Sequence, residues 1–320
     1  MRITVKMRSV PGLLAGLMLL LTSGSAFAGP YLGINYGPFH ESGQHPGTPI
    51  TDSQFLSDLG IISEKFTYIK TYGDDADSRL DQVVPLAKTH FPKLKIYQGI
   101  FENSDYNSSA DTTYLDTAIS LANNYPQTVI AVVVGNECLD TDVNSKPISV
   151  AQLIADLQYV RTRLKNKGNV QVTTSLGYQA AVSYGAQLKP HVDSMMINIY
   201  PFYGKVPIGG AIANLIGAYA MFNKLFNGKQ VIIGETGWPS AGATNGSSVP
   251  SVANEATFTK AIFANANKLG STFVFIALDQ PWLSVQDSWG AHWGLWNSSG
   301  NLKFPFTVTK QAKGATGPVH

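Results

Sequence analysis

The sequence predicts an α/β protein folded as a single (β/α)8 barrel, with a catalytic cleft at the C-terminal face of its strands. One observation is the alternation of strand-like and helix-like segments, in which the strand candidates recur every ~34 residues, about the length of one β/α unit. The other is the pair of apolar runs at 129–134 and 231–233, which are rich in β-branched residues. Such runs are typical of strands buried on both faces of a parallel sheet.

The strand candidates are spread over most of the chain. They begin near Tyr31, Phe66, Leu94, Thr128, Val170, Val192, Gln230 and Thr272. Helical patterns lie between them, over residues 53–66, 80–90, 114–124, 149–167, 211–226 and 254–269. The clearest helix begins after Ser149, a good N-cap, and ends near Lys167-Gly168, a basic last turn followed by a helix stop. An open doubly wound sheet is the alternative, but the glycine fingerprint of a nucleotide site does not follow the first strand.

Residues 1–28 have the pattern of a signal peptide. Basic residues come first, an apolar stretch covers 13–21, and Ala26-Phe-Ala28 offers a cleavage site. The apolar stretch is shorter than the ~20 residues of a membrane span, so an uncleaved anchor is the less favoured alternative. We therefore expect a catalytic domain of residues 29–320 that is exported, to a periplasm or out of the cell, without stable membrane insertion. We also expect it to act as a monomer.

The composition limits the classes of ligand. The formal net charge of the 320 residues is +2 and no basic run occurs, so nucleic acid is not an expected partner. The chain is 14% charged and 11% aromatic, which suits uncharged ligands that stack on rings. The single cysteine, Cys138, excludes an intrachain disulfide, and with no His or Lys close to it in the sequence we expect a buried thiol. The six histidines show no metal-ligand spacing, so neither a metal nor another cofactor is expected.

Two glutamates stand at the ends of predicted buried strands. Glu137 follows the run that begins at Val129, and Glu235 follows Val231-Ile-Ile-Gly. Barrels place their chemistry at the carboxyl ends of the strands, and a glutamate pair there suits glycoside hydrolysis. Capping or ion pairing is the structural alternative for each glutamate. Other strands also end in polar or aromatic side chains, namely Asn35, Tyr36, Tyr72, Gln98, Asn136, Tyr178, Asn198, Tyr200, Trp238, Asp279, Gln280 and Trp282.

At these residues the chain resembles glycoside hydrolase family 17, the retaining β-1,3-glucanases and glucanosyltransferases with a (β/α)8 fold. The matching segments are GINYGP at 33–38, VVVGNE at 132–137, INIYPF at 197–202, GETGWPS at 234–240, LDQPW at 278–282 and GAHWGLW at 290–296. They follow the order of the family. The form DQPW resembles bacterial glucan-remodelling members, whereas many fungal members carry DEPW.

The resemblance implies a role for each matching residue. Glu137 would be the acid/base and Glu235 the nucleophile in an attack on β-1,3-glucan oligo- or polysaccharide. Asn136 would contact the 2-hydroxyl group of the sugar in subsite −1. The other substrate-binding residues that we expect are Tyr36, Asn198, Tyr200, Trp238, Gln280 and Trp282.

A retaining mechanism makes a further demand on the pair. The two carboxyl groups stand ~5–5.5 Å apart, so one of them must have a raised pKa and stay protonated near neutral pH. The bacterial resemblance favours glucanosyl transfer alongside hydrolysis, with Trp282, Trp289, Trp293 and Trp296 as a possible acceptor site. The alternatives are a plain endo-β-1,3-glucanase and a non-catalytic glucan-binding protein. A metal-dependent hydrolase on the same barrel would need ligand clusters that the sequence lacks.

Overall fold

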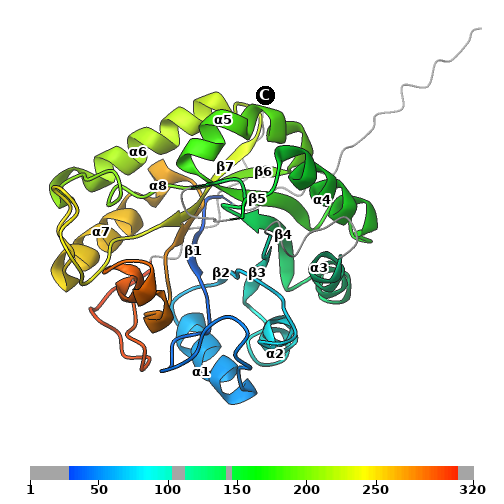
Figure 1. Ribbon diagram of the computed structural model, residues 1–320, viewed down its shortest axis with the longest axis horizontal. Coiled ribbons are helices and arrows are strands. Elements are labelled where there is room, and N and C mark those ends of the chain that lie inside the picture. Colours follow the sequence, from blue (N-terminus) through cyan, green and yellow to red (C-terminus); the bar gives the residue numbers. More distant parts are fainter. Residues whose placement is uncertain (1–28, 103–111, 142–145, 309–320) are drawn as a thin grey trace, which may run out of the picture.

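The structure is a closed barrel of parallel strands surrounded by helices (Figure 1). It is a computed structural model, which describes residues 29–102, 112–141 and 146–308. Each strand pairs with its neighbours in sequence, and β1 pairs with β8 to close the barrel. The strands are β1 (Leu32–Asn35), β2 (Tyr68–Lys70), β3 (Lys95–Ile100), β4 (Val129–Asn136), β5 (Gln171–Gly177), β6 (Ser194–Asn198), β7 (Gln230–Thr236) and β8 (Thr272–Val274). The predicted (β/α)8 fold is confirmed.

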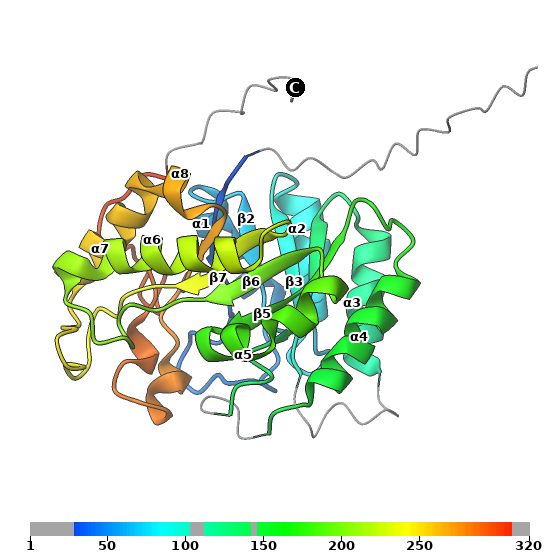
Figure 2. The same ribbon diagram turned by 90° about the horizontal axis from the view of Figure 1, so that it is seen from above.

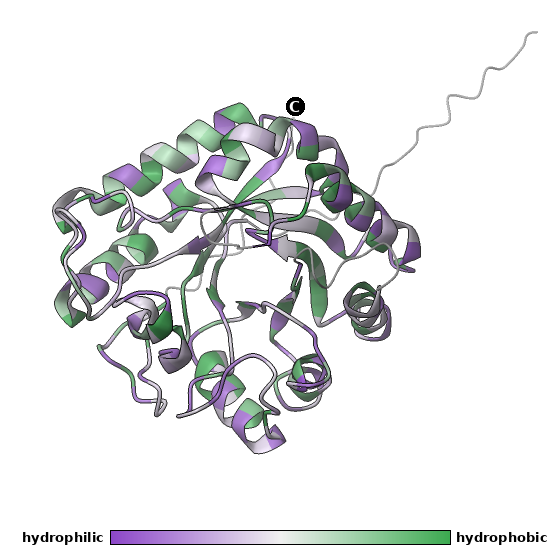
Figure 3. Ribbon diagram, in the orientation of Figure 1, coloured by the Kyte–Doolittle hydropathy of each residue, from purple (hydrophilic) through white to green (hydrophobic). Residues whose placement is uncertain are grey.

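The helices lie on the outside of the barrel (Figure 2). They are α1 (Asp52–Ser63), α2 (Val83–His90), α3 (Thr113–Asn124), α4 (Val150–Arg163), α5 (Tyr178–Leu188), α6 (Ile208–Leu225), α7 (Val252–Ala264) and α8 (Ala266–Leu269). Short 3-10 turns are η1 (Leu80–Gln82), η2 (Lys189–His191), η3 (Pro281–Val285) and η4 (Gly290–His292). Hydrophobic and hydrophilic residues alternate along the outer helices, as amphipathic helices packed on a sheet require (Figure 3).

Most predicted elements are confirmed, with two differences. Ser149 does cap α4, because its side chain accepts a hydrogen bond from the Gln152 amide, but the helix ends at Arg163 rather than near Lys167. Helix α5 was not predicted. Gly177 ends β5 and is itself the N-cap of α5, so Tyr178 begins a helix instead of ending a strand.

The inside of the barrel is apolar at one end and polar at the other. The apolar layer is a separate cluster of buried residues, Tyr31, Tyr97, Ala131, Val133, Met196, Ile232 and Phe273. Side chains two residues further along a strand lie on the same face, one layer nearer its carboxyl end. Lys70 therefore follows Tyr68 on the inner face of β2, and Asn198 follows Met196 on the inner face of β6. This upper layer supplies the polar groups of the site described below.

The predicted signal peptide, residues 1–28, lies outside the described residues, and its cleavage stays a prediction. Residues 309–320 of the expected catalytic domain also lie outside them. Within the described ranges, none of the helices is both long and apolar enough to cross a membrane.

Candidate active site

The two predicted carboxylates come to the same end of the barrel. Glu137 directly follows β4, and Glu235 is the sixth residue of β7. The backbone turns sharply before Glu137, where Gly135 has a φ of 73° and Glu137 itself a φ of 53°. A side chain at Gly135 would also meet Cys138 Sγ at 2.5 Å. The glycine thus allows β4 to end in a turn that presents Glu137.

Glu235 is a buried carboxylate with several hydrogen-bond donors. Its Oε1 accepts from Lys70 Nζ and from the Tyr72 hydroxyl, each at 2.9 Å. Its Oε2 accepts from the Tyr200 hydroxyl at 2.6 Å. Burial and the nearby Glu235 charge hold the pKa of both tyrosines well above the usual value, so the hydroxyls keep their protons and donate. The donors and the ammonium group stabilise the ionised form of Glu235.

Glu137 has the opposite environment. Burial, and after it the charge of Glu235, raises the pKa of Glu137 to about 8, against the smaller opposing effects of Asn198 and Lys70. The carboxyl group accepts one hydrogen bond, from Asn198 Nδ2 at 3.0 Å, and Asn198 Oδ1 in turn accepts from Ser175 Oγ at 2.8 Å. At neutral pH Glu137 therefore keeps its proton, next to a carboxyl group that accepts three hydrogen bonds, one of them from an ammonium group. Two carboxyl groups in such different environments mark an acid and a nucleophile or base.

Lys70 is one of the residues of this site that were not predicted from the sequence. Its side chain is 1% exposed, and its ammonium group joins Glu235 Oε1 to Asn136 Oδ1, which it reaches at 2.7 Å. Asn136 is thereby fixed beside Glu235. The available signal was a lysine within the apolar and aromatic strand candidate that begins at Phe66, because a buried charge needs a partner. The partner lies 165 residues further along the chain, which local patterns do not reveal.

Four of the expected substrate-binding residues line one cavity of about 240 Å³. They are Tyr36, Asn136, Gln280 and Trp282. Tyr36 is 1% exposed and its hydroxyl donates to Asp58 Oδ2 at 2.8 Å, so this tyrosine lies within the wall of the cavity and offers little surface to a sugar. Gln280 holds the wall together, since its amide donates to the Gly37 carbonyl and its Oε1 accepts from the Trp282 indole. Two of the other three expected residues, Asn198 and Tyr200, contact the carboxylates directly.

Trp238 is placed differently from the expectation. It is 1% exposed, its indole donates to the Val249 carbonyl, and its ring packs on Phe202 and Phe258. No face of this ring is open to a sugar in the structure, so Trp238 supports the cleft from behind instead of forming its surface. The backbone of Trp238 lies at the end of β7, as predicted, but its side chain points into the core and not into the cleft.

Two other tryptophans also belong to the interior. Trp296 packs with Phe66 and Phe306 away from the carboxylates, and Trp293 lies buried under Tyr200 and Phe275. They cannot stack an acceptor sugar in this arrangement. Phe275, just after β8, was not predicted as a site residue, yet its ring contacts both Tyr72 and Tyr200 and lines the cavity beside Asn136.

The arrangement can deliver a proton to one face of a substrate bond and a carboxylate to an adjacent atom. Over the described ranges, no cluster of three or more His, Cys, Asp or Glu side chains is arranged to hold a metal ion. Cys138 is buried, and burial holds the pKa of its thiol far above the usual value, as expected for a structural cysteine.

Several known proteins are similar to this chain. It is 28% identical over 279 residues to a probable β-glucosidase, btgE, of Emericella nidulans, which covers 83% of this chain and 47% of the relative. It is 25% identical over 296 residues to a probable glucan endo-1,3-β-glucosidase, btgC, of Aspergillus fumigatus, covering 85% of this chain and 42% of that protein. The chain thus spans less than half the length of these two relatives.

Solved structures show the same fold. A β-1,3-glucanosyltransferase of Rhizomucor miehei, determined as an active-site mutant with laminaritriose, superposes with a TM-score of 0.70 at 22% identity, over 87% of this chain and 97% of that one. An endo-laminarinase from Formosa has a TM-score of 0.70 at 19% identity, over 89% and 92% of the two chains. The family model described as the BtgE/BtgC glycoside hydrolase domain matches residues 33–294. The chain therefore belongs to the BtgE/BtgC glycoside hydrolase family, and the resemblance to glycoside hydrolase family 17 is confirmed.

Proposed function

We propose that this protein cleaves β-1,3-glucosidic bonds with retention of configuration and transfers the glycosyl unit to another glucan as well as to water. The observation that carries this proposal is the division of charge in the pair. Glu137, with a pKa of about 8, stands as a neutral acid beside Glu235, whose carboxylate accepts three charge-stabilising hydrogen bonds. The names of the relatives, a glucanosyltransferase and a laminarinase among them, support β-1,3-glucan as the substrate.

In the first step a Glu235 oxygen attacks the anomeric carbon while the bond from that carbon to the glycosidic oxygen breaks. The leaving oxygen takes the proton of Glu137, so one sugar hydroxyl is formed and Glu137 becomes the carboxylate. Lys70, Tyr72 and Tyr200 hold Glu235 in place for the attack. Asn136, whose Oδ1 accepts from Lys70, would bind the 2-hydroxyl group of the same sugar, and the resemblance to the family supports this role.

In the second step Glu137 removes a proton from the acceptor hydroxyl. The acceptor oxygen bonds to the anomeric carbon, the ester bond to Glu235 breaks, and both glutamates return to their first state. Water as the acceptor gives hydrolysis, and a sugar hydroxyl gives transfer. The DQPW segment at 279–282 resembles bacterial remodelling members and supports the transfer branch.

A plain endo-β-1,3-glucanase is the second candidate. It has the same pair and the same first step, but water outcompetes sugars in the second. A non-catalytic glucan-binding protein is disfavoured by the raised pKa of Glu137 and the ion-paired state of Glu235, which binding alone does not require.

The deciding experiment follows the length of products formed from defined β-1,3-gluco-oligosaccharides over a range of concentrations. Products longer than the substrate support transfer. Only shorter products at every concentration leave the glucanase, and the absence of any turnover refutes both enzymes. A Glu235→Gln variant is the control for contaminating activity, because it keeps the shape of the site and loses the nucleophile.

We also propose that residues 29–320 act as an exported monomeric catalytic domain. The basic, apolar and A-x-A segments of residues 1–28 support export. Mass spectrometry of the protein recovered from its host would test cleavage after Ala28, and light scattering would test the monomer.

A further inference from the structure

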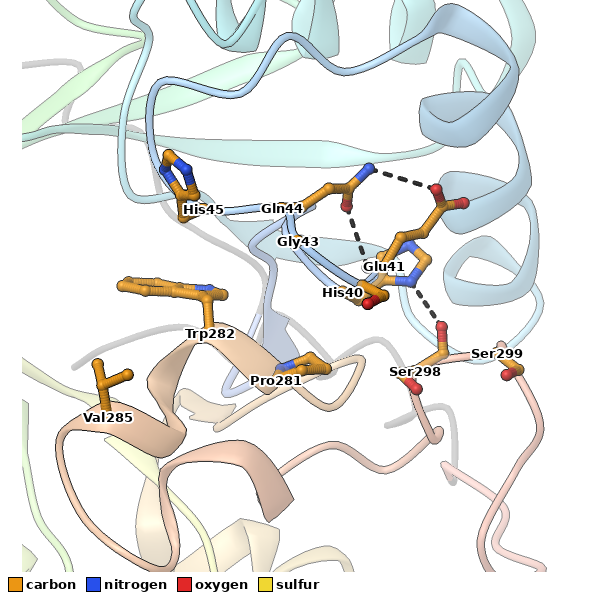
Figure 4. A pocket seen from close by; sticks show the side chains of 11 residues that line it. His40, Glu41, Gly43, Gln44, His45, Pro281, Trp282, Val285, Ser298 and Ser299 are labelled. Carbon is orange, nitrogen blue, oxygen red and sulfur yellow. Dashed lines mark hydrogen bonds between the residues drawn. The ribbon is translucent and has the colours of Figure 1, made fainter.

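A second cavity borders Trp282. Its volume is about 790 Å³, within the range of ligand-binding pockets. The loop after β1, residues 40–45, forms one wall, η3 forms another, and Ser298 and Ser299 close it (Figure 4). Trp282 lines both this cavity and the smaller one that contains Asn136 and Tyr72. The two cavities are therefore neighbours that share Trp282, and the proposed reaction steps do not use the larger one.

The lining suits a neutral polyhydroxyl ligand. The Trp282 indole N–H is already bonded to Gln280 Oε1, which leaves the ring itself for apolar contact with a sugar face. Glu41 and His45 are exposed, and Figure 4 shows His45 on the same side of the cavity as Trp282. Glu41 lies at the other end of the loop from His45 and accepts a hydrogen bond from Gln44 Nε2 at 3.4 Å, so the carboxylate and the imidazole can each bind a different hydroxyl group of a ligand. None of the described residues that line this space is a lysine or arginine, so an anionic ligand has no counter-charge there.

The wall of this cavity is fixed from within the protein. His40 is 6% exposed, and its ring nitrogens lie 2.7 Å from the Ser298 carbonyl and 3.0 Å from Asp58 Oδ1. The Nε2 atom also lies 3.1 Å from Gln54 Nε2, so the ring contacts the Ser298 carbonyl, Asp58 and Gln54 at the same time. The loop of residues 40–45 is thus hydrogen-bonded to α1 through Asp58 and to Ser298 on the other side of the cavity. A wall held in this way does not have to be ordered when a ligand binds.

The position of the acid shows which part of a glucan chain would enter. Glu137 is held by Asn198 of β6, and Glu235 Oε2 is held by Tyr200, which follows β6. Glu235 Oε1, in contrast, faces Lys70 and Tyr72 of the β2 side. The leaving sugar must lie on the side of the proton donor. The retained sugar and its continuation then extend the other way, toward the β1, β2 and β8 ends and Trp282.

We propose that the cavity lined by Glu41, His45, Trp282 and Ser298 is a distal donor subsite for β-1,3-glucan. It binds the non-reducing part of the chain, the part retained on Glu235 during the reaction. It would therefore set the length of the segment that is transferred. This inference rests on the proposed function, and it puts Trp282 on the donor side instead of the acceptor side expected from its position after the eighth strand.

The opposite side of the cleft has its own aromatic residue. Tyr203 is 48% exposed and its ring contacts Tyr200 and Trp289. Burial, followed by the charges of Asp287, Glu137 and Glu235, raises its pKa. It lies in the segment after β6, on the side of the proton donor. Tyr203 is therefore the matched residue for the acceptor side, and its variant should have a different phenotype from variants of the cavity.

The test measures kcat/KM on a ladder of β-1,3-gluco-oligosaccharides labelled at the reducing end. In the wild type kcat/KM should rise at the length that first reaches the cavity. The double variant Glu41→Ala/His45→Ala should lose this rise, by about tenfold or more for the loss of hydrogen bonds that include a charged one, with shorter substrates unchanged. Tyr203→Ala should instead raise the concentration of added acceptor that is needed to saturate the transfer reaction. Glu64→Ala removes an equal charge at the far end of α1 and should match the wild type.

Three results would overturn the donor subsite. They are an equal loss at every length, an unchanged length dependence in the double variant, and an effect confined to acceptor saturation. Failure of the proposed function gives a different result, since the wild type itself would then turn over none of the oligosaccharides. A thermal unfolding transition like that of the wild type would show that the double variant is folded. Glu41→Gln, which keeps one acceptor oxygen, should keep part of the rise in kcat/KM with substrate length.

Discussion

Replacement of Lys70 by methionine tests whether the buried ammonium group keeps the nucleophile ionised. Lys70 Nζ lies 2.9 Å from Glu235 Oε1, and the two side chains are 1% and 5% exposed. At this distance two unit charges attract by about 6 kcal/mol for an effective dielectric constant of ~20. Removal of one partner of a buried ion pair costs about 3–5 kcal/mol. Methionine keeps the length and packing of the side chain while it removes the charge.

The cost falls on the ionised form of Glu235, because that form alone loses the attraction. Tyr72 and Tyr200 still donate to the carboxylate, so we take the lower part of the range. Since each 1.36 kcal/mol is a factor of ten, kcat/KM at neutral pH should fall by about 10²–10³-fold. Loss of Lys70 also removes one of the effects that lower the pKa of Glu137, so the acid stays protonated to higher pH. Activity should therefore recover in part as the pH is raised.

The assay is kcat/KM on a β-1,3-gluco-oligosaccharide over a range of pH, together with thermal unfolding. Lys70→Arg keeps the positive charge and should stay within about tenfold of the wild type, although its fork cannot reproduce the ammonium geometry. Lys224→Met, at the exposed end of α6, is the control for the loss of a lysine. A folded Lys70→Met protein within threefold of wild-type activity would refute the reasoning, and so would a loss that does not change with pH.

Four further predictions follow from the same geometry. In the proposed mechanism Glu137 acts when it is protonated, and its pKa is about 8, so kcat/KM should fall as the pH rises through about 8. Asn198→Ala removes a hydrogen bond that lowers this pKa, so the fall in kcat/KM should move to higher pH. A fall at the same pH in the variant would show that Asn198 does not control the pKa of Glu137. Glu235→Gln should lose ~10³-fold or more of turnover, and a fluoro-sugar inactivator should label Glu235 of the wild type, which peptide mapping can contradict. Glu137→Ala should lose less rate on substrates with good leaving groups than on glucans, and azide should restore turnover as a β-glycosyl azide; equal losses without rescue would assign Glu137 another role. Burial raises the pKa of Glu102 to about 9, so the folded protein holds a proton that the unfolded chain releases above pH ~4.5. The free energy of unfolding should therefore fall as the pH rises toward 9. In denaturant titrations Glu102→Gln should lack this fall, and its free energy of unfolding should rise relative to the wild type by about 2–4 kcal/mol between pH 5 and pH 8.

The barrel was predictable because its strands are buried on both faces. A run such as 129–134 has few other stable places than the middle of a parallel sheet, and its repetition along the chain fixes the topology. Helix α5 was missed because Gly177 serves both as the end of β5 and as the cap of the helix. No polar loop separates the two elements, so the pattern offers no boundary.

The two carboxylates were predictable for a similar reason, but the contacts of Glu235 with Lys70 and Tyr72 were not. The carboxyl end of a buried strand is a position that sequence can identify, and Glu137 and Glu235 both occupy it. Lys70 and Tyr72 occupy it too, yet their role depends on which strands face one another across the barrel. Trp238 also shows that sequence identifies a strand-end position without giving the direction of the side chain. Its backbone is at the strand end as expected, while its ring points into the core against Phe202 and Phe258.

The cavity beyond Trp282 bears on the competition between water and sugar acceptors. In the proposed scheme the glycosyl-enzyme persists until an acceptor reaches the anomeric carbon, and a sugar wins only if it is held in attack geometry. A donor segment held by Glu41, His45 and Trp282 keeps the retained chain in place during that time, but it does not favour either acceptor. The choice must then be made on the side of Glu137, where Tyr203 offers an exposed ring beside the proton acceptor. Length of the transferred segment and the ratio of transfer to hydrolysis should therefore be separable properties, set by opposite ends of one cleft.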